Sequence, residues 1–380
     1  MKKTLHAALL VAAGLFPAAA FACTSAIVAA NANPSGRPIL WKHRDTSNLD
    51  NKIEYVAPDE EGFGYVALFN ASDMRLEEAW MGMNDAGFAV MNTASYNIKD
   101  DKVPEKQMDK EGVLMTNALR TCRSVDDFAR LLDSYPRPMG VEANFGVIDA
   151  QGNGAYFETN NHSYVRYNLD EAPDGVLVRT NYSHSGRKGE GYGFVREANA
   201  ECLLEQYAAS GTVTPELLTE KLSRTFYHDG KKQDFTLSGN RALLDEDFIP
   251  RFKSTATVAI EGCLPVESLD SVSPEFVKGQ YIMWSGLGYP PASEIRAVRC
   301  APDGVPEGLS GTLPGGHAPL CDKANAVRNK VFTSRGKKGA RYIDMSLLFN
   351  PDSTGYAQKV MKENHEVYRR ETLKRDGGED

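Results

Sequence analysis

Strand-like runs of small, β-branched and aromatic residues occur in clusters along this chain of 380 residues, with helical patterns grouped between them. Such side chains pack well on a pleated surface and are typical of β-strands. Strict alternation of strands and helices would favour a doubly wound parallel sheet, whereas clusters favour layered sheets with helices set apart. The pattern therefore predicts an α+β fold. The strand-like runs are residues 23–30, 38–42, 65–69, 88–92, 144–148, 155–158 and 176–180.

Helical patterns lie between these runs. Ser124 is followed by Val-Asp-Asp and then by apolar residues at helical spacing, which is typical of a capped helix start. Thr214 and Pro215 form a second start, since proline suits the first helical position. We also expect helices over residues 194–208 and 356–373. One face of the first of these is roughly apolar and carries Val195, Ala198, Cys202, Leu203 and Tyr207.

The first 22 residues have the anatomy of a secretory signal peptide. A positively charged start precedes the apolar residues 7–16, which are too few to span a bilayer, and Ala-Phe-Ala at residues 20–22 matches a cleavage site. Cleavage of residues 1–22 would leave one mature domain, residues 23–380, beginning with Cys23. We expect a periplasmic or extracellular protein without a membrane span. The sequence does not indicate an oligomeric state.

The composition and the net charge of the chain argue against some classes of binding partner. The chain is 42% hydrophobic and 25% charged, as in ordinary globular proteins. Its formal net charge is −8, and removing residues 1–22, which hold two lysines and no acidic residue, takes it to −10. A chain this acidic is a poor partner for nucleic acid or an anionic membrane surface.

Six cysteines are present, and an exported chain meets an oxidising compartment in which disulfides form. If Cys23 stays reduced, five others remain, an odd number. Cys300 and Cys321 flank a loop rich in glycine and proline and are the best candidates for one bridge. No cysteine has CxxC zinc spacing, so we expect no metal. The pairing among Cys122, Cys202, Cys263, Cys300 and Cys321 is left open by the spacing.

Cys23 directly follows the cleavage site, and three interpretations fit that position: a structural cysteine, a lipid-modified anchor, or a catalytic N-terminal residue. Lipid modification needs an aliphatic residue three positions earlier, whereas this chain has Ala20 there, followed by the bulky Phe21. A catalytic role has a physical basis, because the thiolate is the nucleophile and a free thiol has a pKa of about 8.5. The free α-amino group, with a pKa of about 7.7–8.0, could take the thiol proton directly or through a water.

Several short motifs follow Cys23 in a fixed order across nearly the whole mature chain. They are Cys23-Thr-Ser, Trp41-Lys-His-Arg-Asp, Gly82-Met-Asn-Asp-Ala-Gly-Phe, Asn144-Phe, Asp149-Ala-Gln-Gly, Thr180-Asn, Phe248-Ile-Pro-Arg and Met283-Trp. The set resembles the cysteine N-terminal-nucleophile (Ntn) hydrolases, above all the choloylglycine hydrolase and penicillin V acylase group and the related acyl-coenzyme A:6-aminopenicillanic acid acyltransferases. The resemblance implies a four-layer αββα sandwich, with two packed antiparallel sheets between helical layers.

The resemblance also implies a role for each matched residue. Cys23 would attack an amide carbonyl and form a thioester, while Asp45 would hydrogen-bond to the α-ammonium or the thiol. The side-chain NH2 of Asn181 would donate to the developing oxyanion, a contact worth about 3–4 kcal/mol. Arg251 would brace the site electrostatically, and a backbone N–H near Asn92 would be the second oxyanion donor.

One position departs from the pattern. Lys42 stands where relatives usually have an arginine, and Arg44 lies directly beside Asp45. Neighbours on a strand point to opposite faces, so Lys42 and Arg44 should face away from Asp45. Arg44 is a candidate catalytic residue that would reach the thiolate only through a bulge or turn. Asn144 is expected to be structural.

The sequence thus predicts an exported amidohydrolase or acylase that cleaves the C–N amide bond of an N-acylated small molecule through a Cys23 thioester. No cofactor and no metal are expected. An acyltransferase or dipeptidase of the same superfamily, and a lipid-anchored binding protein without enzymatic activity, remain alternatives. Bile-salt conjugates, phenoxyacyl penicillins, N-acyl homoserine lactones and N-acyl amino acids are all compatible substrates.

Overall fold

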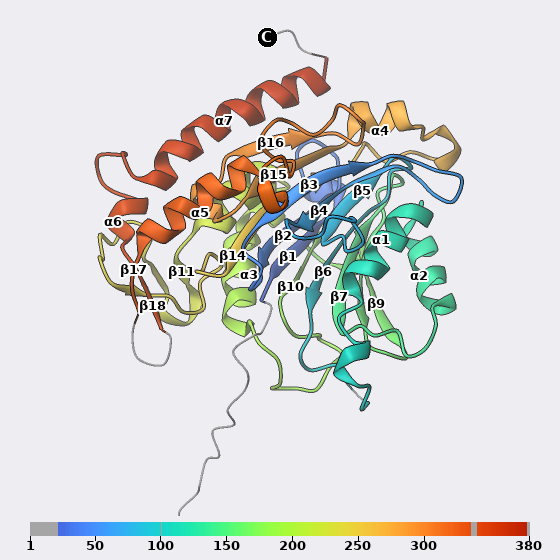
Figure 1. Cartoon of the computed structure of the whole chain (residues 1–380), viewed down its shortest axis with the longest axis horizontal. Helices are drawn as coiled ribbons and strands as arrows, with labels where there is room; N and C mark the ends of the chain where they lie inside the picture. The colour runs from blue at the N-terminus through green and yellow to red at the C-terminus, as the bar shows by residue number, and fades with distance from the viewer. Residues whose placement is uncertain (1–21, 100, 336–339, 378–380) are drawn as a thin grey trace, which may run out of the picture.

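The computed structural model describes residues 22–99, 101–335 and 340–377, and two antiparallel sheets form its centre (Figure 1). Every neighbouring pair of strands in both sheets is antiparallel. The seven-stranded sheet has the order β3 (Asn51–Val56), β4 (Tyr65–Asn70), β5 (Met81–Asn84), β6 (Ala89–Ala94), β7 (Ala143–Ile148), β8 (Gly154–Thr159), β9 (Tyr164–Asn168). The six-stranded sheet has the order β10 (Val176–Arg179), β1 (Thr24–Val28), β2 (Ile39–Asp45), β14 (Ser254–Glu261), β15 (Ile282–Leu287), β16 (Ile295–Val298).

Helices cover the outer face of each sheet, and the predicted αββα fold is confirmed (Figure 1). Helices α1 (Glu111–Thr121) and α2 (Val125–Ser134) pack on the seven-stranded sheet through one apolar cluster. Helices α3 (Phe194–Ala209) and α7 (Tyr356–Arg375) pack on the six-stranded sheet through another. Each sheet is thus apolar on both faces, which explains why strand residues of either parity are buried.

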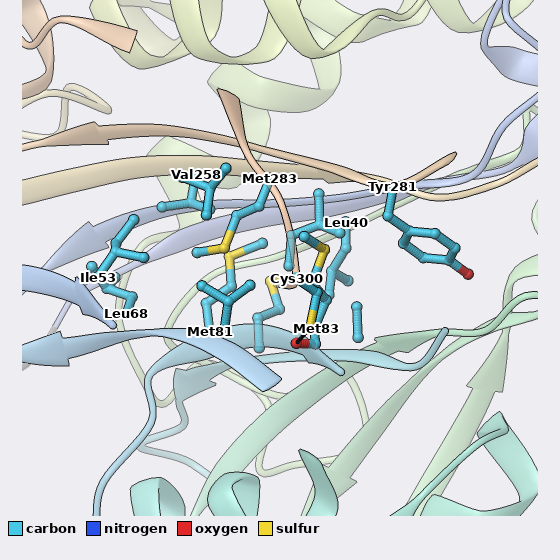
Figure 2. Close-up of a cluster of buried hydrophobic side chains, with 14 of the residues drawn as sticks. Leu40, Ile53, Leu68, Met81, Met83, Val258, Tyr281, Met283 and Cys300 are labelled. Atoms are coloured by element: carbon cyan, nitrogen blue, oxygen red, sulfur yellow. Dashed lines mark hydrogen bonds between the residues drawn. The ribbon is translucent and has the colours of Figure 1, made fainter. Parts of the chain in front are cut away.

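The core between the sheets is rich in sulfur. Met81 and Met83 of β5 lie against Met283 of β15, with Leu40 of β2 beside them (Figure 2). Unbranched methionine side chains fill irregular gaps between curved sheets. The face of β2 that carries Leu40 continues to Lys42, so the apolar core gives way to polar groups toward the end of this strand.

Smaller elements complete the fold. A three-stranded sheet has the order β13 (Leu243–Leu244), β18 (Arg341–Ile343), β17 (Phe332–Arg335), and a short hairpin joins β11 (Tyr227–His228) to β12 (Gln233–Asp234). The remaining α-helices are α4 (Pro274–Gln280), α5 (Pro319–Val331) and α6 (Met345–Leu348). Short 3-10 or π-helical turns lie at Ala30–Ala32, Glu105–Gln107, Leu169–Glu171, Leu217–Lys221, Leu222–Arg224, Asp229–Lys231, Leu269–Ser271, Pro290–Ala292 and Pro314–Gly316. Within the described ranges, no helix combines the length and apolarity needed to cross a bilayer.

Local sequence signals are confirmed at two turns. The Ser124 hydroxyl accepts a hydrogen bond from the Asp127 N–H at 3.0 Å, and the Asp127 carboxylate accepts the Ser124 N–H at 2.9 Å, a complete capping box at the start of α2. In the β7–β8 hairpin the Asp149 carboxylate accepts two backbone N–H groups of the turn. Gly152 has φ of 83°, a conformation that favours glycine.

Two expectations were wrong. Cys300 and Cys321 do not form a disulfide, and all six cysteines are free. Both thiols are buried in the core between the sheets, where they pack as small apolar groups and contact backbone groups. The expected apolar face of α3 was also wrong, because Cys202 is exposed. The face that α3 buries instead carries Arg196, Glu197, Asn199, Ala200, Leu204 and Ala208. The predicted signal peptide falls on residues 1–22, of which residues 1–21 lie outside the described residues.

Candidate active site

Cys23 lies immediately before β1 and is 5% exposed. Its parity along the strand is that of Ile27, which packs in the core between the sheets, so the thiol shares that face. The thiol also lies 3.8 Å from the main-chain carbonyl oxygen of Asp45. Beside Cys23 is a cavity of about 610 Å³ whose walls come from both sheets and from α1. A cavity of this size accommodates a small organic substrate.

Two cations of β2 form the inner wall of this cavity. The Lys42 ammonium donates hydrogen bonds to the Trp80 carbonyl and to Oδ1 of Asn92, both at 2.8 Å. Burial lowers the pKa of Lys42 to about 7, against the opposing effect of Cys23 and with a further contribution from Arg44. Neutral groups therefore hold the Lys42 ammonium, on the face of β2 that Cys23 shares.

Arg44 lies beside Lys42 on that wall. Its guanidinium donates to the side-chain oxygens of Asn51 and Asn70, and it lies 4.9 Å from the Trp80 ring centre. The expectation that Arg44 would need a bulge to approach the thiol was wrong. The β1–β2 register is regular, and Cys23 is on the face of Arg44 rather than on that of Asp45.

The Asp45 side chain lies in a network on the opposite face of β2. Its carboxylate forms an ion pair with Arg251 and accepts a hydrogen bond from the Ser254 hydroxyl at 2.6 Å. His43 contacts the same hydroxyl at 2.8 Å. Burial alone would raise the pKa of Asp45, but Arg251 and the His43 hydrogen bond hold it well below its usual value. The structure thus brings Asp45 and Arg251 together, and Asp45 contacts Cys23 through its main chain.

Asn181 holds the nitrogen of Cys23. Its Oδ1 accepts the Cys23 N–H at 2.8 Å and an N–H of Arg196 at 2.8 Å, while its Nδ2 donates to the Ala94 carbonyl at 2.9 Å. The oxygen of Asn181, rather than the expected NH2 group, therefore faces Cys23. Because two donors converge on this oxygen, the orientation of the amide is fixed by its hydrogen bonds.

Arg196 of α3 is a site residue that the sequence did not reveal. It is fully buried and donates to the Cys23 carbonyl, to the Thr24 hydroxyl at 3.0 Å and to Asn181. Burial, helped by Arg251, lowers the pKa of Arg196 to about 10. One sequence pattern could have indicated that Arg196 is buried. Ala200, Leu204 and Ala208 recur every four residues on the face that α3 buries, and the same spacing extends back to position 196.

Asn144 supports the loop that follows β10. Its Nδ2 donates to the carbonyls of Thr180 and Tyr182, at 3.2 and 3.0 Å, on either side of Asn181. Its Oδ1 accepts from the Ser183 hydroxyl at 2.6 Å. These contacts agree with the expected structural role of Asn144.

Glu111 and Glu142 also line the cavity. Glu111, at the start of α1, accepts the backbone N–H of Glu142 at 2.9 Å. Burial raises the pKa of Glu111 to about 7, against backbone hydrogen bonds that lower it. The Glu142 carboxylate lies 3.6 Å from the ammonium of Lys99. The cavity is therefore lined by acidic as well as cationic side chains.

One group of side chains in the described part of the chain has the composition of a metal site. The ligand atoms of Asp50, His317 and Asp322 lie within 4.8 Å of one another, and all three residues are half-buried. The His317 ring contacts the Asp322 carboxylate at 2.9 Å. None of the three lines the cavity beside Cys23.

Two antiparallel sheets between helical layers form an αββα sandwich, and Cys23 lies directly before its inner strand β1. Residues 34–207 match the family Acyl-coenzyme A:6-aminopenicillanic acid acyl-transferase, and the predicted resemblance to this group is confirmed. The matched region includes Asp45, Asn92, Asn181 and Arg196 but ends before Arg251 and begins after Cys23. No curated protein matches the chain.

Three solved structures are similar to this chain at low identity. One is an N-acylethanolamine-hydrolyzing acid amidase ortholog of Caenorhabditis elegans, 12% identical, covering 67% of this chain and 97% of that chain, with a TM-score of 0.40. A conjugated bile acid hydrolase from Clostridium perfringens is 10% identical, covers 72% and 92%, and has a TM-score of 0.40. A penicillin V acylase from Agrobacterium tumefaciens is 12% identical, covers 73% and 86%, and has a TM-score of 0.34.

Proposed function

We propose that this chain is an amidohydrolase that cleaves the C–N amide bond of an N-acylated small molecule, with Cys23 as nucleophile once residues 1–22 have been removed. One observation carries the proposal. The nitrogen of Cys23 is held by the buried side chain of Asn181 at 2.8 Å, while its thiol shares the face that lines a cavity of about 610 Å³. This placement of the nitrogen and of the thiol supports the proposal.

In this reaction the free α-amino group of Cys23 takes the thiol proton, directly or through one water. The sulfur attacks the carbonyl carbon, and an S–C bond forms as the carbonyl oxygen gains negative charge. The tetrahedral intermediate collapses, the C–N bond breaks and the α-ammonium returns the proton to the leaving amine. Water then cleaves the thioester and releases the acid. Asn181 and Arg196 are positioning residues, since they hold the nitrogen and carbonyl of Cys23.

Acyl transfer is the second candidate, because the matched family is named for it. The two reactions share every step up to the thioester and differ only in whether water or a second amine accepts the acyl group. Incubating the protein with an N-acyl amine and a second amine distinguishes them, since transfer yields a new amide and hydrolysis yields the free acid.

We also propose that the mature protein is periplasmic or extracellular. The anatomy of residues 1–22 supports export, and a poor lipid-attachment pattern before Cys23 favours a free amine over an anchored binding protein. The intact mass and N-terminal sequence of the exported protein test this directly. A free Cys23 amine is the expected result, and a lipid adduct would remove the proposed base.

The central experiment compares two exported forms. One begins at Cys23, and the other carries a single glycine inserted between Ala22 and Cys23, so that the Cys23 nitrogen becomes an amide. An amide cannot accept a proton near neutral pH, so we expect the extended form to be inactive against a panel of N-acyl amines, with amine release as the signal. The pH profile of the Cys23 form should show ionisation of the amine–thiol pair as a unit. Equal turnover by both forms would overturn the N-terminal-nucleophile mechanism.

A further inference from the structure

Three acidic side chains lie together in the cavity beside Cys23. Glu111 accepts the backbone N–H of Glu142 at 2.9 Å, and Asp109 is two residues before Glu111 in the chain. All three line the cavity, which is large enough for a small organic molecule. The cation that pairs with them is Lys99, whose ammonium lies 3.6 Å from the Glu142 carboxylate and whose side chain is 41% exposed. Among the described residues, Asp109 and Glu111 have no ion pair.

Glu111 is the most deeply buried of the three and keeps one carboxylate oxygen free. It is 7% exposed, and while its Oε1 accepts the Glu142 N–H, its Oε2 accepts no hydrogen bond from another described residue. Burial raises the pKa of Glu111 to about 7 against backbone hydrogen bonds, and the acidic neighbours Asp109 and Glu142 raise it as well. A cation in the cavity acts in the opposite direction, because it favours the ionised carboxylate and supplies a donor to Oε2.

The spread of these carboxylates suits an organic cation better than a metal ion. Among the described residues, the only group with three ligand atoms within 4.8 Å of one another is the one around His317. The oxygens of Asp109, Glu111 and Glu142 are therefore farther apart, whereas a divalent ion holds its oxygen ligands at about 2.0–2.6 Å. An ammonium group has three N–H donors that point in different directions, so it can contact carboxylates that are spread around it.

We propose that the substrate of this chain carries a protonated amine in addition to the amide bond that is cleaved, and that Glu111 and Glu142 bind this cation. The inference rests on the proposed function and names its substrate class, which is N-acylated small molecules with a second, basic nitrogen. Glu111 and Glu142 are therefore specificity-determining residues. They take no part in bond breaking, because the thiol and the α-amino group of Cys23 carry those steps.

Alkylation of Cys23 by a matched pair of iodoacetamides tests the inference without a known substrate. One reagent carries a trimethylammonioethyl group on its amide nitrogen, and the other carries the uncharged neohexyl group of the same shape. The Cys23 thiolate attacks the methylene carbon, an S–C bond forms and iodide leaves. Peptide mass spectrometry follows Cys23, and the ratio of the two rates is divided by the same ratio for free cysteine. We expect the cationic reagent, or its homologue with a longer linker, to react about tenfold faster at pH 8.

Three variants assign this preference to the two glutamates. Glu111→Gln keeps the Oε1 acceptor and the shape of the side chain but removes its charge, so the rate ratio should fall severalfold. Glu142→Gln should lower the ratio in the same way and keeps the test valid if Glu111→Gln does not fold. The matched control is Glu205→Gln, an exposed glutamate of α3 outside the cavity, which should keep the wild-type ratio.

The pH dependence of the ratio provides a second measurement. Since the pKa of Glu111 is raised to about 7, its charge and the preference for the cation should grow from pH 6 to pH 8, while the quaternary nitrogen stays charged. Ionisation of Cys23 affects both rates equally and cancels. Lys42 loses its charge over the same range and acts in the same direction, so the part that Glu111→Gln removes is the relevant one. The other ionisable groups that act on the two glutamates or line the cavity are Asp101, Asp109, Lys99, Arg44, Asp45 and Tyr96.

The outcomes separate the substrate class from the proposed reaction. A rate ratio that is equal in the wild type, Glu111→Gln and Glu142→Gln would overturn the inference. If the ratio depends on the two glutamates but no N-acyl amine is cleaved, the cation site stands and the proposed reaction fails. If neutral N-acyl amines are cleaved as fast as their cationic homologues, the reaction stands and the substrate class is wrong.

Discussion

The two faces of β2 carry charged side chains in different surroundings. On the face toward the helices, Asp45 is enclosed by Arg251, Ser254 and His43, so each charge has a partner. On the face toward the other sheet, Lys42 and Arg44 are held only by neutral groups. Alternation along a single strand thus puts the ion-paired carboxylate on one face and the two cations held by neutral groups on the other.

The largest expected effect concerns the thiol on the cavity face. Cys23→Ala should abolish amine release while leaving the free energy of unfolding nearly unchanged, because the residue stands at the edge of the core and loses a single sulfur atom. Turnover and urea unfolding measure the two quantities. Cys202→Ala, which alters an exposed thiol, is the matched control and should retain activity. Activity of Cys23→Ala within about tenfold of wild type, a barrier change of only about 1.4 kcal/mol, would end the nucleophile hypothesis.

Asp45→Asn tests the compensated face. It removes the carboxylate that forms the ion pair with Arg251, and we expect a loss of about 3 kcal/mol in the free energy of unfolding. The native pKa of Asp45 is depressed, so its stabilisation is present above the unfolded value of 3.8 and is lost as pH falls below it. Urea unfolding at pH 7 and pH 3 should show the difference from wild type narrowing in acid. Lys42→Met, on the other face, should not lower stability; an equal loss in both variants would erase the distinction between the faces.

Asn181→Ala tests how tightly the nitrogen of Cys23 must be held. The variant removes the acceptor that the Cys23 nitrogen and Arg196 share, and we expect kcat to fall about 100-fold with a smaller change in KM. Steady-state kinetics on a cleaved N-acyl amine measures both constants. Asn144→Ala is a useful comparison, since it should act through the same loop with a weaker effect. A change confined to KM would instead place Asn181 in substrate binding.

The smallest expected effect concerns Glu111, which lines the cavity. The pKa of Glu111 is raised to about 7 from 4.5, so its contribution to stability is present below pH 4.5 and is lost as pH rises through 7. Between pH 5 and pH 7 the wild type should lose about 2 kcal/mol of unfolding free energy through this group. Glu111→Gln should flatten that part of the profile. Thermal unfolding of both proteins across this range measures it, and parallel profiles would show that Glu111 ionises freely.

The sequence predicted correctly those features that depend only on residues close together along the chain. The capping box at Ser124, the hairpin at Asp149 and the alternation of residues 42 to 45 each depend on neighbours only, and each is present in the structure. The pairing of Asp45 with Arg251 joins the end of β2 to the segment before β14, and only the motif resemblance placed both residues in one site.

The features that the sequence did not reveal depend on how helices and strands that are distant in sequence pack against one another. Arg196 is buried because the start of α3 packs over the start of β1, whereas an arginine in a helix otherwise indicates a solvent-facing position. The spacing of Cys300 and Cys321 suggested a disulfide across a loop, yet the turn after β16 and helix α5 direct the two thiols into the core. The side of β2 that Cys23 shares likewise follows from the register between two strands.

Ala22 and Cys23 are both buried in the folded protein, and this burial bears on whether cleavage between them comes before or after folding. In the folded protein Ala22 is 9% exposed and its N–H donates to the Asp45 carbonyl at 3.3 Å, while Cys23 is 5% exposed. A peptidase needs an extended, accessible segment, so the Ala22–Cys23 bond is a substrate only while the chain is unfolded. If residues 1–22 are removed as proposed, removal precedes folding, and a precursor that folds first is trapped with the Cys23 nitrogen still in an amide bond.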